Sequence, residues 1–476
     1  MSFDLDSDLR RQLGYRLIDQ IDAFYSSLPD RPVQLPAAQR TYGPLFDPLP
    51  EDSSDPLETL NQVCRDMIDN GFHVPAANYF GLMNPTPTYM GFLGESLVAG
   101  LNPQIATLAR SQLASKIEIE TLRWIGERVG WPGAFNGTFT SGGNEANFSA
   151  LALALAWKFP GVIEDGVASI VGSPLAYASA ESHHSLDKSA GLLGIGRKAL
   201  RRVSVNAQLQ LDPVALDNAI AADLLAGRKP FCVVATAGTT SSGIIDELPA
   251  IAEVCRRHSL WLHVDGAYGA SLVFSDQHRH LVRGIELADS ITIDPHKWLA
   301  VPFVAGVILT RRPEILERAF AVPAPYMPKA AGAVLPDNSK ISTQWTRRMN
   351  AMKLWLTFKV HGRKAYEEHI DRQMKLARGF AGWVERSDHF ELAAPVIVPI
   401  LNLRLKGVDA RQRAALHSAI VEEVTRDGRR WISDTIVAGE SVIRVMIISY
   451  LTEQRHLDAL QESLTDAVRT CVGDRS

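Results

Sequence analysis

Two apolar runs in the middle of the chain constrain the fold most. Residues 231–248 (FCVVATAGTTSSGIIDEL) begin as a continuous β-prone run and end in a Gly-Thr-Thr loop, and residues 260–270 (LWLHVDGAYGA) contain a second run that ends at Asp265. Continuous apolar runs separated by helical segments are typical of parallel strands buried on both faces. The sequence therefore predicts an α/β fold with a mainly parallel central sheet flanked by helices. Functional residues of such sheets collect at the carboxyl ends of the strands, where Thr240, Asp265 and Lys297 all fall.

The stretch SITIDPHKWLAVPFVAG, residues 290–306, places Lys297 between a histidine and a tryptophan directly after a β-like run. Burial disfavours the charged ammonium, so a lysine in such surroundings is either paired or used as an amine. A lysine amine that loses its proton is a nucleophile for carbonyl groups, including the aldehyde of pyridoxal phosphate. The alternative interpretation is a lysine whose stem is buried while its head reaches water.

The stretch GTFTSGGNEANFSA, residues 137–150, has the pattern of an anion-binding turn. A short β-prone run enters a Ser-Gly-Gly turn and leaves through Asn144 into an alanine-rich helix. Glycines let backbone N–H groups approach an anion, and a helix N-terminus adds the positive end of a dipole. Many helix starts carry glycine without binding anything, so this motif alone does not establish a phosphate site.

Composition and charge exclude several classes of function. The 476 residues are 46% hydrophobic and 21% charged, as in an ordinary soluble globular protein. A formal net charge of −4 gives no basic footprint for nucleic acid or an anionic membrane. The first residues, MSFDLDSDLR, are acidic and lack an apolar core, which argues against a secretory signal, and no apolar run reaches membrane-spanning length. Four widely spaced cysteines without a CxxC motif predict neither a disulfide nor a metal framework and favour a cytoplasmic location.

The hydrophobic periodicity divides the chain into three parts. Helical patterns that begin near Leu9 and Leu57 predict an N-terminal helical arm over residues 1–75. An arm of this size cannot bury a core alone, so we expect it to pack on a second subunit and predict a homodimer. Residues 76–365 are predicted to form a large domain and residues 366–476 a small C-terminal α+β domain. The elements expected in the small domain are strands at 400–405 and 442–448, a helix at 410–426 and a final helix that runs to 471.

Five motifs occur in one order along the chain: SGGNEA, HHSLDKSAGLLG, ATAGTTSSGIID, HVDGAYG and DPHKW. With these motifs the chain resembles the pyridoxal-phosphate-dependent group II amino-acid decarboxylases over about residues 9–465. HVDGAYG together with DPHKW is a highly specific pair. The resemblance implies the aspartate-aminotransferase type fold, pyridoxal 5′-phosphate as cofactor, and decarboxylation of an L-amino acid to the amine and CO2. It also implies a homodimer with sites assembled across a two-fold interface.

The same resemblance implies a role for each matched residue. Lys297 is implied to form the Schiff base with the cofactor. Asp265 is implied to keep the pyridine nitrogen protonated, because only a cationic ring draws off the electrons left by bond cleavage at Cα. His184, the second of two adjacent histidines, matches the histidine that stacks on the ring, whereas His183 does not. The other implied cofactor contacts are Gly143, Asn144, Thr240, Ala267, Asp294 and His296.

The substrate pocket is expected in part from the loop HVPAANYFGLMNPTPTYMG, residues 73–91. Ordered loops rich in proline, asparagine and aromatic residues tend to carry binding residues. Tyr79 and Phe80 are expected to form part of the pocket wall, with room for an apolar or aromatic substrate side chain. Arg110 and His73 are the alternatives for reading an acidic side chain.

Decarboxylases of this family usually carry a tyrosine in a mobile loop, where it reprotonates the carbanion. Here residues 328–344 contain no tyrosine. Tyr326, His184 or a water are the remaining proton donors. Relatives without the tyrosine let the intermediate react with oxygen, so an aldehyde with ammonia and peroxide is the alternative product. A third reaction, amino-group transfer, needs an arginine that clamps the α-carboxylate, for which Arg444 is the candidate.

Overall fold

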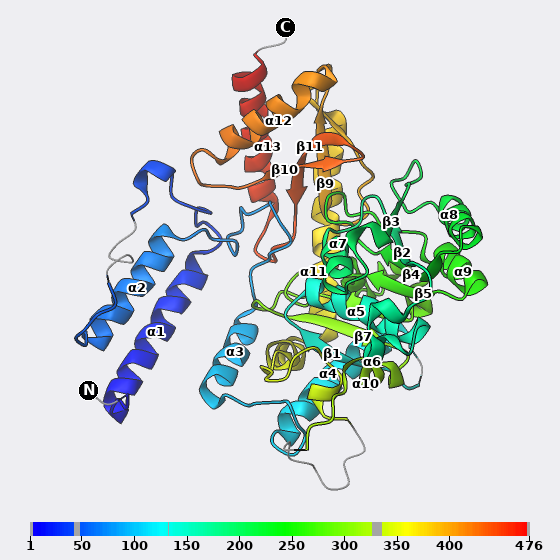
Figure 1. Ribbon diagram of the computed structural model, residues 1–476. Helices are drawn as coiled ribbons and strands as arrows, with labels where there is room; N and C mark the ends of the chain where they lie inside the picture. Colours follow the sequence, from blue (N-terminus) through cyan, green and yellow to red (C-terminus); the bar gives the residue numbers. More distant parts are fainter. Residues whose placement is uncertain (1–2, 42–47, 132, 326–335, 474–476) are drawn as a thin grey trace.

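The computed structural model describes residues 3–41, 48–131, 133–325 and 336–473. Figure 1 shows a helical hairpin at the N-terminus, a large domain built on one sheet, and a smaller C-terminal unit with a sheet of its own. The large sheet has seven strands and the small sheet has four. The predicted α/β fold with an N-terminal arm and a small C-terminal α+β unit is therefore confirmed.

Two helices, α1 (Ser7–Ser27) and α2 (Pro56–Asn70), form the N-terminal arm. The side chains of Asp6 and Asp55 cap them by accepting hydrogen bonds from N–H groups of the first turns. The two helices pack against each other, and in Figure 1 they lie at the left, apart from the sheet. Neither helix contains a buried residue. The arm therefore leaves large apolar side chains exposed: Tyr15, Leu17, Ile18, Val63 and Met67.

The large sheet has the strand order β1-β7-β6-β5-β4-β2-β3. Every residue of β5 and β6 is buried, as the continuous apolar runs predict. All strands run in the same direction except β7, which is antiparallel to both of its neighbours. The strands are β1 (Asn136–Thr140), β2 (Pro174–Ser179), β3 (Leu200–Val203), β4 (Lys229–Thr236), β5 (Trp261–Asp265), β6 (Ser290–Ile293) and β7 (Gly306–Thr310).

Helices cover the large sheet. Helix α5 (Gly143–Lys158) packs across β4, β5, β6 and β7 with an alanine- and leucine-rich surface that is buried over most of its length. Helix α3 (Tyr89–Leu101) packs along α11 (Ala351–Arg386). The remaining helices of this domain are α4 (Gln112–Val129), α6 (Val162–Asp165), α7 (Ser185–Leu192), α8 (Pro213–Leu225), α9 (Leu248–His258) and α10 (Glu314–Phe320). Within the described ranges, no helix is both long and apolar enough to cross a membrane.

The C-terminal unit is an antiparallel sheet of order β10-β11-β9-β8 with helices packed on it. Its predicted strand at 400–405 is β9, and the strand predicted at 442–448 is β11, which begins and ends two residues earlier. Helix α11 (Ala351–Arg386) bends at Gly362 (φ 70°) and crosses the boundary predicted at 365, so the exact domain limits stay a prediction. The elements are β8 (Phe390–Leu392), β9 (Ile400–Leu405), α12 (Ala410–Thr425), β10 (Ser433–Val437), β11 (Glu440–Met446) and α13 (Gln454–Val472).

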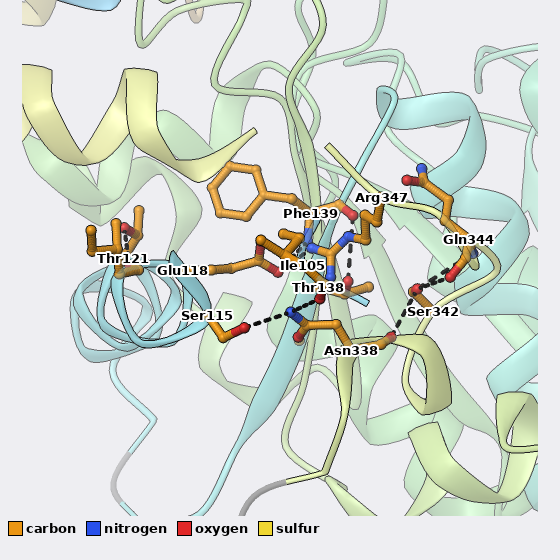
Figure 2. A network of polar contacts seen from close by, with 12 residues as sticks. Ile105, Ser115, Glu118, Thr121, Thr138, Phe139, Asn338, Ser342, Gln344 and Arg347 are labelled. Atoms are coloured by element: carbon orange, nitrogen blue, oxygen red, sulfur yellow. Dashed lines mark hydrogen bonds and ion pairs between the residues drawn. The ribbon is translucent and has the colours of Figure 1, made fainter. Parts of the chain in front are cut away.

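A buried polar network fixes the segment that leads into α11 (Figure 2). Arg347 forms an ion pair with Glu118 of α4, and both side chains are no more than 2% exposed. Asn338 donates to the carbonyl oxygen of Ile105 at 2.8 Å and lies 3.4 Å from the hydroxyl of Ser115. These contacts hold the segment against α4. Glu118 of α4 also accepts from the N–H of Phe139 in β1, the strand that leads into the glycine turn before α5.

Candidate active site

A cavity of about 320 Å³ lies at the carboxyl ends of β4, β5 and β6. Lys297 and Asp265 both line this cavity, as they must if their side chains act on one bound molecule. Of the predicted cofactor residues, the structure brings all but His184 to this cavity. They are Gly143, Asn144, Thr240, Asp265, Ala267, Asp294, His296 and Lys297.

The N-terminus of α5 forms one wall of the cavity. Gly142 turns the chain into the helix with φ 143°, a backbone angle that favours glycine. The helix has no side-chain N-cap, so no capping side chain accepts hydrogen bonds from the first N–H groups, which face the cavity. A Cβ on Gly143 would lie 2.7 Å from Oδ2 of Asp294 and 3.3 Å from Cβ of Ala267. A side chain at this position would therefore crowd Asp294, while the uncapped helix N-terminus forms a wall that suits an anion.

Lys297 lies in the loop of residues 294–305 that joins β6 to β7. Its Nζ atom is 3.3 Å from Oδ2 of Asp294, while Oδ1 of the same carboxylate is buried without a hydrogen-bond partner. His296 places Nε2 3.8 Å from Oδ2 of Asp294. Burial lowers the pKa of His296, although the charge of Asp294 opposes this effect. The cavity therefore offers an amine and an acceptor oxygen that has no protein partner among the described residues.

The same loop is fixed along its length. Its two ends continue into β6 and β7, which pair with each other. Lys353, whose side chain is 1% exposed, donates to the carbonyl oxygens of Pro302 at 3.2 Å and Val304 at 3.0 Å, and it pairs with Glu95 at 2.7 Å. Burial lowers the pKa of Lys353, and Glu95 partly offsets that effect. The backbone that carries the reactive amine is therefore held from both sides.

Asp265 ends β5 and is 5% exposed. Its Oδ2 accepts a hydrogen bond from Nδ2 of Asn147 at 2.8 Å, and its Oδ1 accepts one from the N–H of Ala267 at 3.2 Å. Asn147 is not among the site residues predicted from the sequence. Its position on α5 was the signal, since Asn147 lies four residues after Gly143 and side chains at that spacing share one helix face.

The structure corrects the prediction for His184. The side chain of His184 is 95% exposed and lies 3.5 Å from Asp187, away from the cavity. His183 lines the cavity instead, and its Nδ1 accepts a hydrogen bond from the N–H of Ser185 at 3.1 Å. Burial lowers the pKa of His183, which Asp265 opposes. The two histidines lie on the turn that begins α7, where adjacent side chains point in different directions.

The structure also corrects the predictions for Tyr79 and Phe80. The ring of Tyr79 stacks on Trp431 with centroids 5.4 Å apart, and Phe80 is fully buried in the core of the C-terminal unit. The backbone explains this placement. The N–H of Phe80 donates to the carbonyl oxygen of Trp431, and the carbonyl oxygen of Phe80 accepts from the N–H of Met446, each at 2.8 Å. Met83 is the residue of this loop that lines the cavity.

Several other candidates lie elsewhere. Arg444 donates to the carbonyl oxygen of Thr240 at 3.0 Å and to the hydroxyl of Ser433, so its guanidinium is engaged within the protein. His73 places Nε2 2.8 Å from the carbonyl oxygen of Ile68 and is not among the described residues that line the cavity. The same holds for Arg110. Tyr326 lies outside the described residues.

The arrangement fits pyridoxal 5′-phosphate. A helix N-terminus without a side-chain cap suits a phosphate, Lys297 supplies an amine for the aldehyde, and Asp265 supplies a carboxylate for a protonated ring nitrogen. The three groups line one cavity, and each matches one functional end of this cofactor: the phosphate, the aldehyde and the ring nitrogen. Fold and site together define a pyridoxal-phosphate-dependent enzyme.

Comparisons with known proteins place the chain within this class. The model of the pyridoxal-dependent decarboxylase conserved domain matches residues 40–406. An aromatic-L-amino-acid decarboxylase of Bacillus atrophaeus is 30% identical over 456 residues, covering 94% of this chain and 93% of that protein. A phenylacetaldehyde synthase of Arabidopsis thaliana is 27% identical over 471 residues, covering 95% of this chain and 94% of that protein.

A solved structure is similar over nearly the full length. The crystal structure of Oryza sativa TDC with pyridoxal phosphate and tryptamine superposes with a TM-score of 0.92 at 25% identity, covering 99% of each chain. The chain belongs to the pyridoxal-dependent decarboxylase family, whose members are carboxy-lyases.

Proposed function

We propose that this enzyme decarboxylates an L-amino acid to CO2 and the corresponding amine. The observation that carries the proposal is the placement of Lys297 and Asp265 on one cavity at the carboxyl ends of parallel strands. When bound, the cofactor supplies an electron sink for the pair of electrons left at Cα as the carboxyl group departs.

The residues of the cavity that were predicted from the sequence each have a proposed task. Lys297 would hold the cofactor through its amine. Asp265, fixed by Asn147, keeps a positive charge on the ring nitrogen. The N-terminus of α5 beside Gly143 and Asn144 binds the phosphate. In addition, Thr240, Ala267, Asp294 and His296 are proposed as cofactor contacts, since all four line the same cavity.

His183 takes the role first predicted for His184. Because its Nδ1 accepts the N–H of Ser185, a neutral ring carries its hydrogen on Nε2. After CO2 leaves, Cα needs one proton to become the carbon of the amine. The Nε2–H group of His183 is the proposed donor, because the ring lines the cavity with Lys297, and the ring takes up a proton from a solvent water as it gives one to Cα.

A second reaction is oxidative. In that case the amino acid, O2 and water give an aldehyde, CO2, ammonia and hydrogen peroxide. Two observations favour this candidate: residues 328–344 contain no tyrosine, and one relative is a phenylacetaldehyde synthase. Amino-group transfer is a weaker third candidate, since Arg444 already donates to Thr240 and Ser433.

The proposed substrate has an apolar or aromatic side chain. Met83 and Val304 give the cavity apolar surface. The aromatic-L-amino-acid decarboxylase among the relatives supports the same class of substrate. We also propose a homodimer, because the arm holds no buried residue in either helix, and a cytoplasmic location, because all four cysteines are free.

The decisive experiment is a screen of the common amino acids with the purified protein and added cofactor. CO2 and amine without peroxide support decarboxylation, whereas oxygen uptake with ammonia and peroxide supports the aldehyde route. The loaded protein should show a visible absorbance band that borohydride bleaches and that Lys297→Ala abolishes. Release of no CO2 from any amino acid, or transfer of the amino group to a keto acid, would contradict the proposal. Sedimentation of an active monomer would contradict the dimer.

A further inference from the structure

We infer that a buried chain of hydrogen bonds behind the cavity, from Trp261 through Ser290, His263 and Asn147, holds Asp265 in place as a hydrogen-bond acceptor. The first three residues are not among the described residues that line the cavity. They are positioning residues, which act on Asp265 through Asn147. The inference deepens the proposed function, since it rests on the role proposed there for Asp265.

The contacts run without a break from β5 and β6 to α5. The indole Nε1–H of Trp261 donates to Oγ of Ser290 at 2.8 Å, and the same Oγ lies 2.9 Å from Nδ1 of His263. Nε2 of His263 lies 3.1 Å from Oδ1 of Asn147. Nδ2 of Asn147 then donates to Oδ2 of Asp265 at 2.8 Å. Each distance is that of an ordinary hydrogen bond.

The two ends of the chain set its direction. The indole nitrogen of Trp261 only donates to Oγ of Ser290, which leaves the hydroxyl hydrogen available for Nδ1 of His263. The carboxylate of Asp265 only accepts, so Nδ2 of Asn147 faces Asp265 and Oδ1 of Asn147 faces His263. A neutral imidazole that accepts at Nδ1 carries its hydrogen on Nε2 and donates it to Oδ1 of Asn147. The amide of Asn147 therefore turns its NH2 group toward the carboxylate of Asp265.

The opposite tautomer is disfavoured. Nδ1 of His263 also lies 3.1 Å from the carbonyl oxygen of Ser290, so a hydrogen on Nδ1 would have a partner. Nε2 and Oδ1 of Asn147 would then be two acceptors 3.1 Å apart with no hydrogen between them. The hydroxyl of Thr292 lies 3.3 Å from Nε2 and 2.8 Å from Oδ1, and its single hydrogen serves only one of them fully. The hydroxyl of Thr292 donates to the same Oδ1 at 2.8 Å, which keeps the amide in its orientation.

Burial makes the chain sensitive to the loss of any member. Trp261, His263 and Ser290 are 0% exposed and Asn147 is 1% exposed, so solvent cannot replace a missing partner. Burial lowers the pKa of His263 to about 4, although the charge of Asp265 opposes this effect. The ring is thus neutral at pH 7 and carries the single N–H that the chain requires.

Asn147 connects two walls of the cavity. Its Nδ2 also lies 3.0 Å from the hydroxyl of Ser185, the first residue of α7, which follows the turn carrying His183. One amide therefore orients Asp265 and fixes the start of the helix beside His183. If the amide reversed, its oxygen would face the carboxylate of Asp265 and repel it.

The tautomer of His263 tests the chain directly. We expect nitrogen-15 spectra of histidine-labelled, cofactor-free protein at pH 7 to show one neutral ring with hydrogen on Nε2 and a bare Nδ1 that disappears in His263→Gln. A hydrogen on Nδ1, or a charged ring at pH 7, would overturn the inference. The tautomer itself is read from the wild-type protein, and His263→Gln serves only to assign the signal.

Ser290→Ala tests the effect on the cofactor. Without the hydroxyl, the ring of His263 should move its hydrogen to Nδ1, and the dissociation constant for pyridoxal phosphate should rise roughly tenfold, as expected when a hydrogen bond to a charged group is lost. Ser271→Ala is the matched control, because Ser271 is 0% exposed and its hydroxyl has no partner among the described residues. Equal affinities of the two variants would overturn the inference.

The two readouts separate this inference from the proposed function. A protein that decarboxylates no amino acid but shows hydrogen on Nε2 of His263 would refute the function and leave the hydrogen-bond chain standing. An active decarboxylase with hydrogen on Nδ1 would do the reverse.

Discussion

Replacing Arg347 by methionine should destabilise the cofactor-free protein by about 3–5 kcal/mol, because it leaves Glu118 as a buried charge without its partner. The side chains of the pair are 1% and 2% exposed. Without Arg347, Oε1 of Glu118 keeps only the N–H of Phe139 at 3.5 Å, and Oε2 has no hydrogen-bond partner. A loss of this size changes the unfolding constant by more than about a hundredfold.

Urea unfolding followed by circular dichroism measures this loss. Arg123→Met is the control, since it breaks exposed ion pairs with Glu120 and Glu127, which water and salt screen, and should change the stability little. The double variant Glu118→Leu/Arg347→Met removes both charges and should recover most of the loss. If Arg347→Met costs no more than Arg123→Met, the buried charge does not carry the penalty assigned to it.

Three further predictions follow from the site and from burial. His183→Ala should lower kcat/KM by about 10²–10⁴-fold, as for a positioned proton donor, whereas His184→Ala should stay within about twofold of wild type; equal losses would contradict the exchange of roles. Gly143→Ala should weaken binding of pyridoxal phosphate by at least about tenfold, because its Cβ would lie 2.7 Å from a carboxylate oxygen; unchanged affinity in a fluorescence titration would refute this. Burial lowers the pKa of His263 and His369 from 6.5 to about 4, so the stability that their neutral rings contribute is complete above pH 6.5 and falls as the pH drops toward 4, where unfolding takes up protons. The urea midpoint should decrease across that window, and His369→Gln should flatten the decrease.

The fold could be predicted where a short stretch of sequence is enough to show that a strand is buried. The apolar runs that became β4 and β5 are buried on both faces, and that property is visible in the sequence without any knowledge of neighbours. Strand β2 was missed because PLAYAS is short and begins with proline. The reversed direction of β7 could not be predicted, because direction depends on which strands it joins and not on its own residues.

The site could be predicted where backbone geometry dictates the residue. Gly143 and Lys297 lie where a turn or loop fixes both position and chemistry. The choice between His183 and His184 depends on how the turn before α7 is rotated. Two adjacent histidines in the sequence do not indicate which of them that rotation directs into the cavity. Tyr79 was misplaced for another reason: its partner, Trp431, is far away in sequence, so nothing local indicated that the ring would stack in a core.

The loop between β6 and β7 is anchored at both ends by two strands that pair with each other. With its backbone immobilised, Lys297→Ala would remove a primary amine and leave a slot of matching size and polarity. A small amine such as methylamine, added to the buffer, would then occupy that slot and stand in for the missing side chain. Restoration of turnover by an added amine would be a chemical consequence of how this loop is anchored.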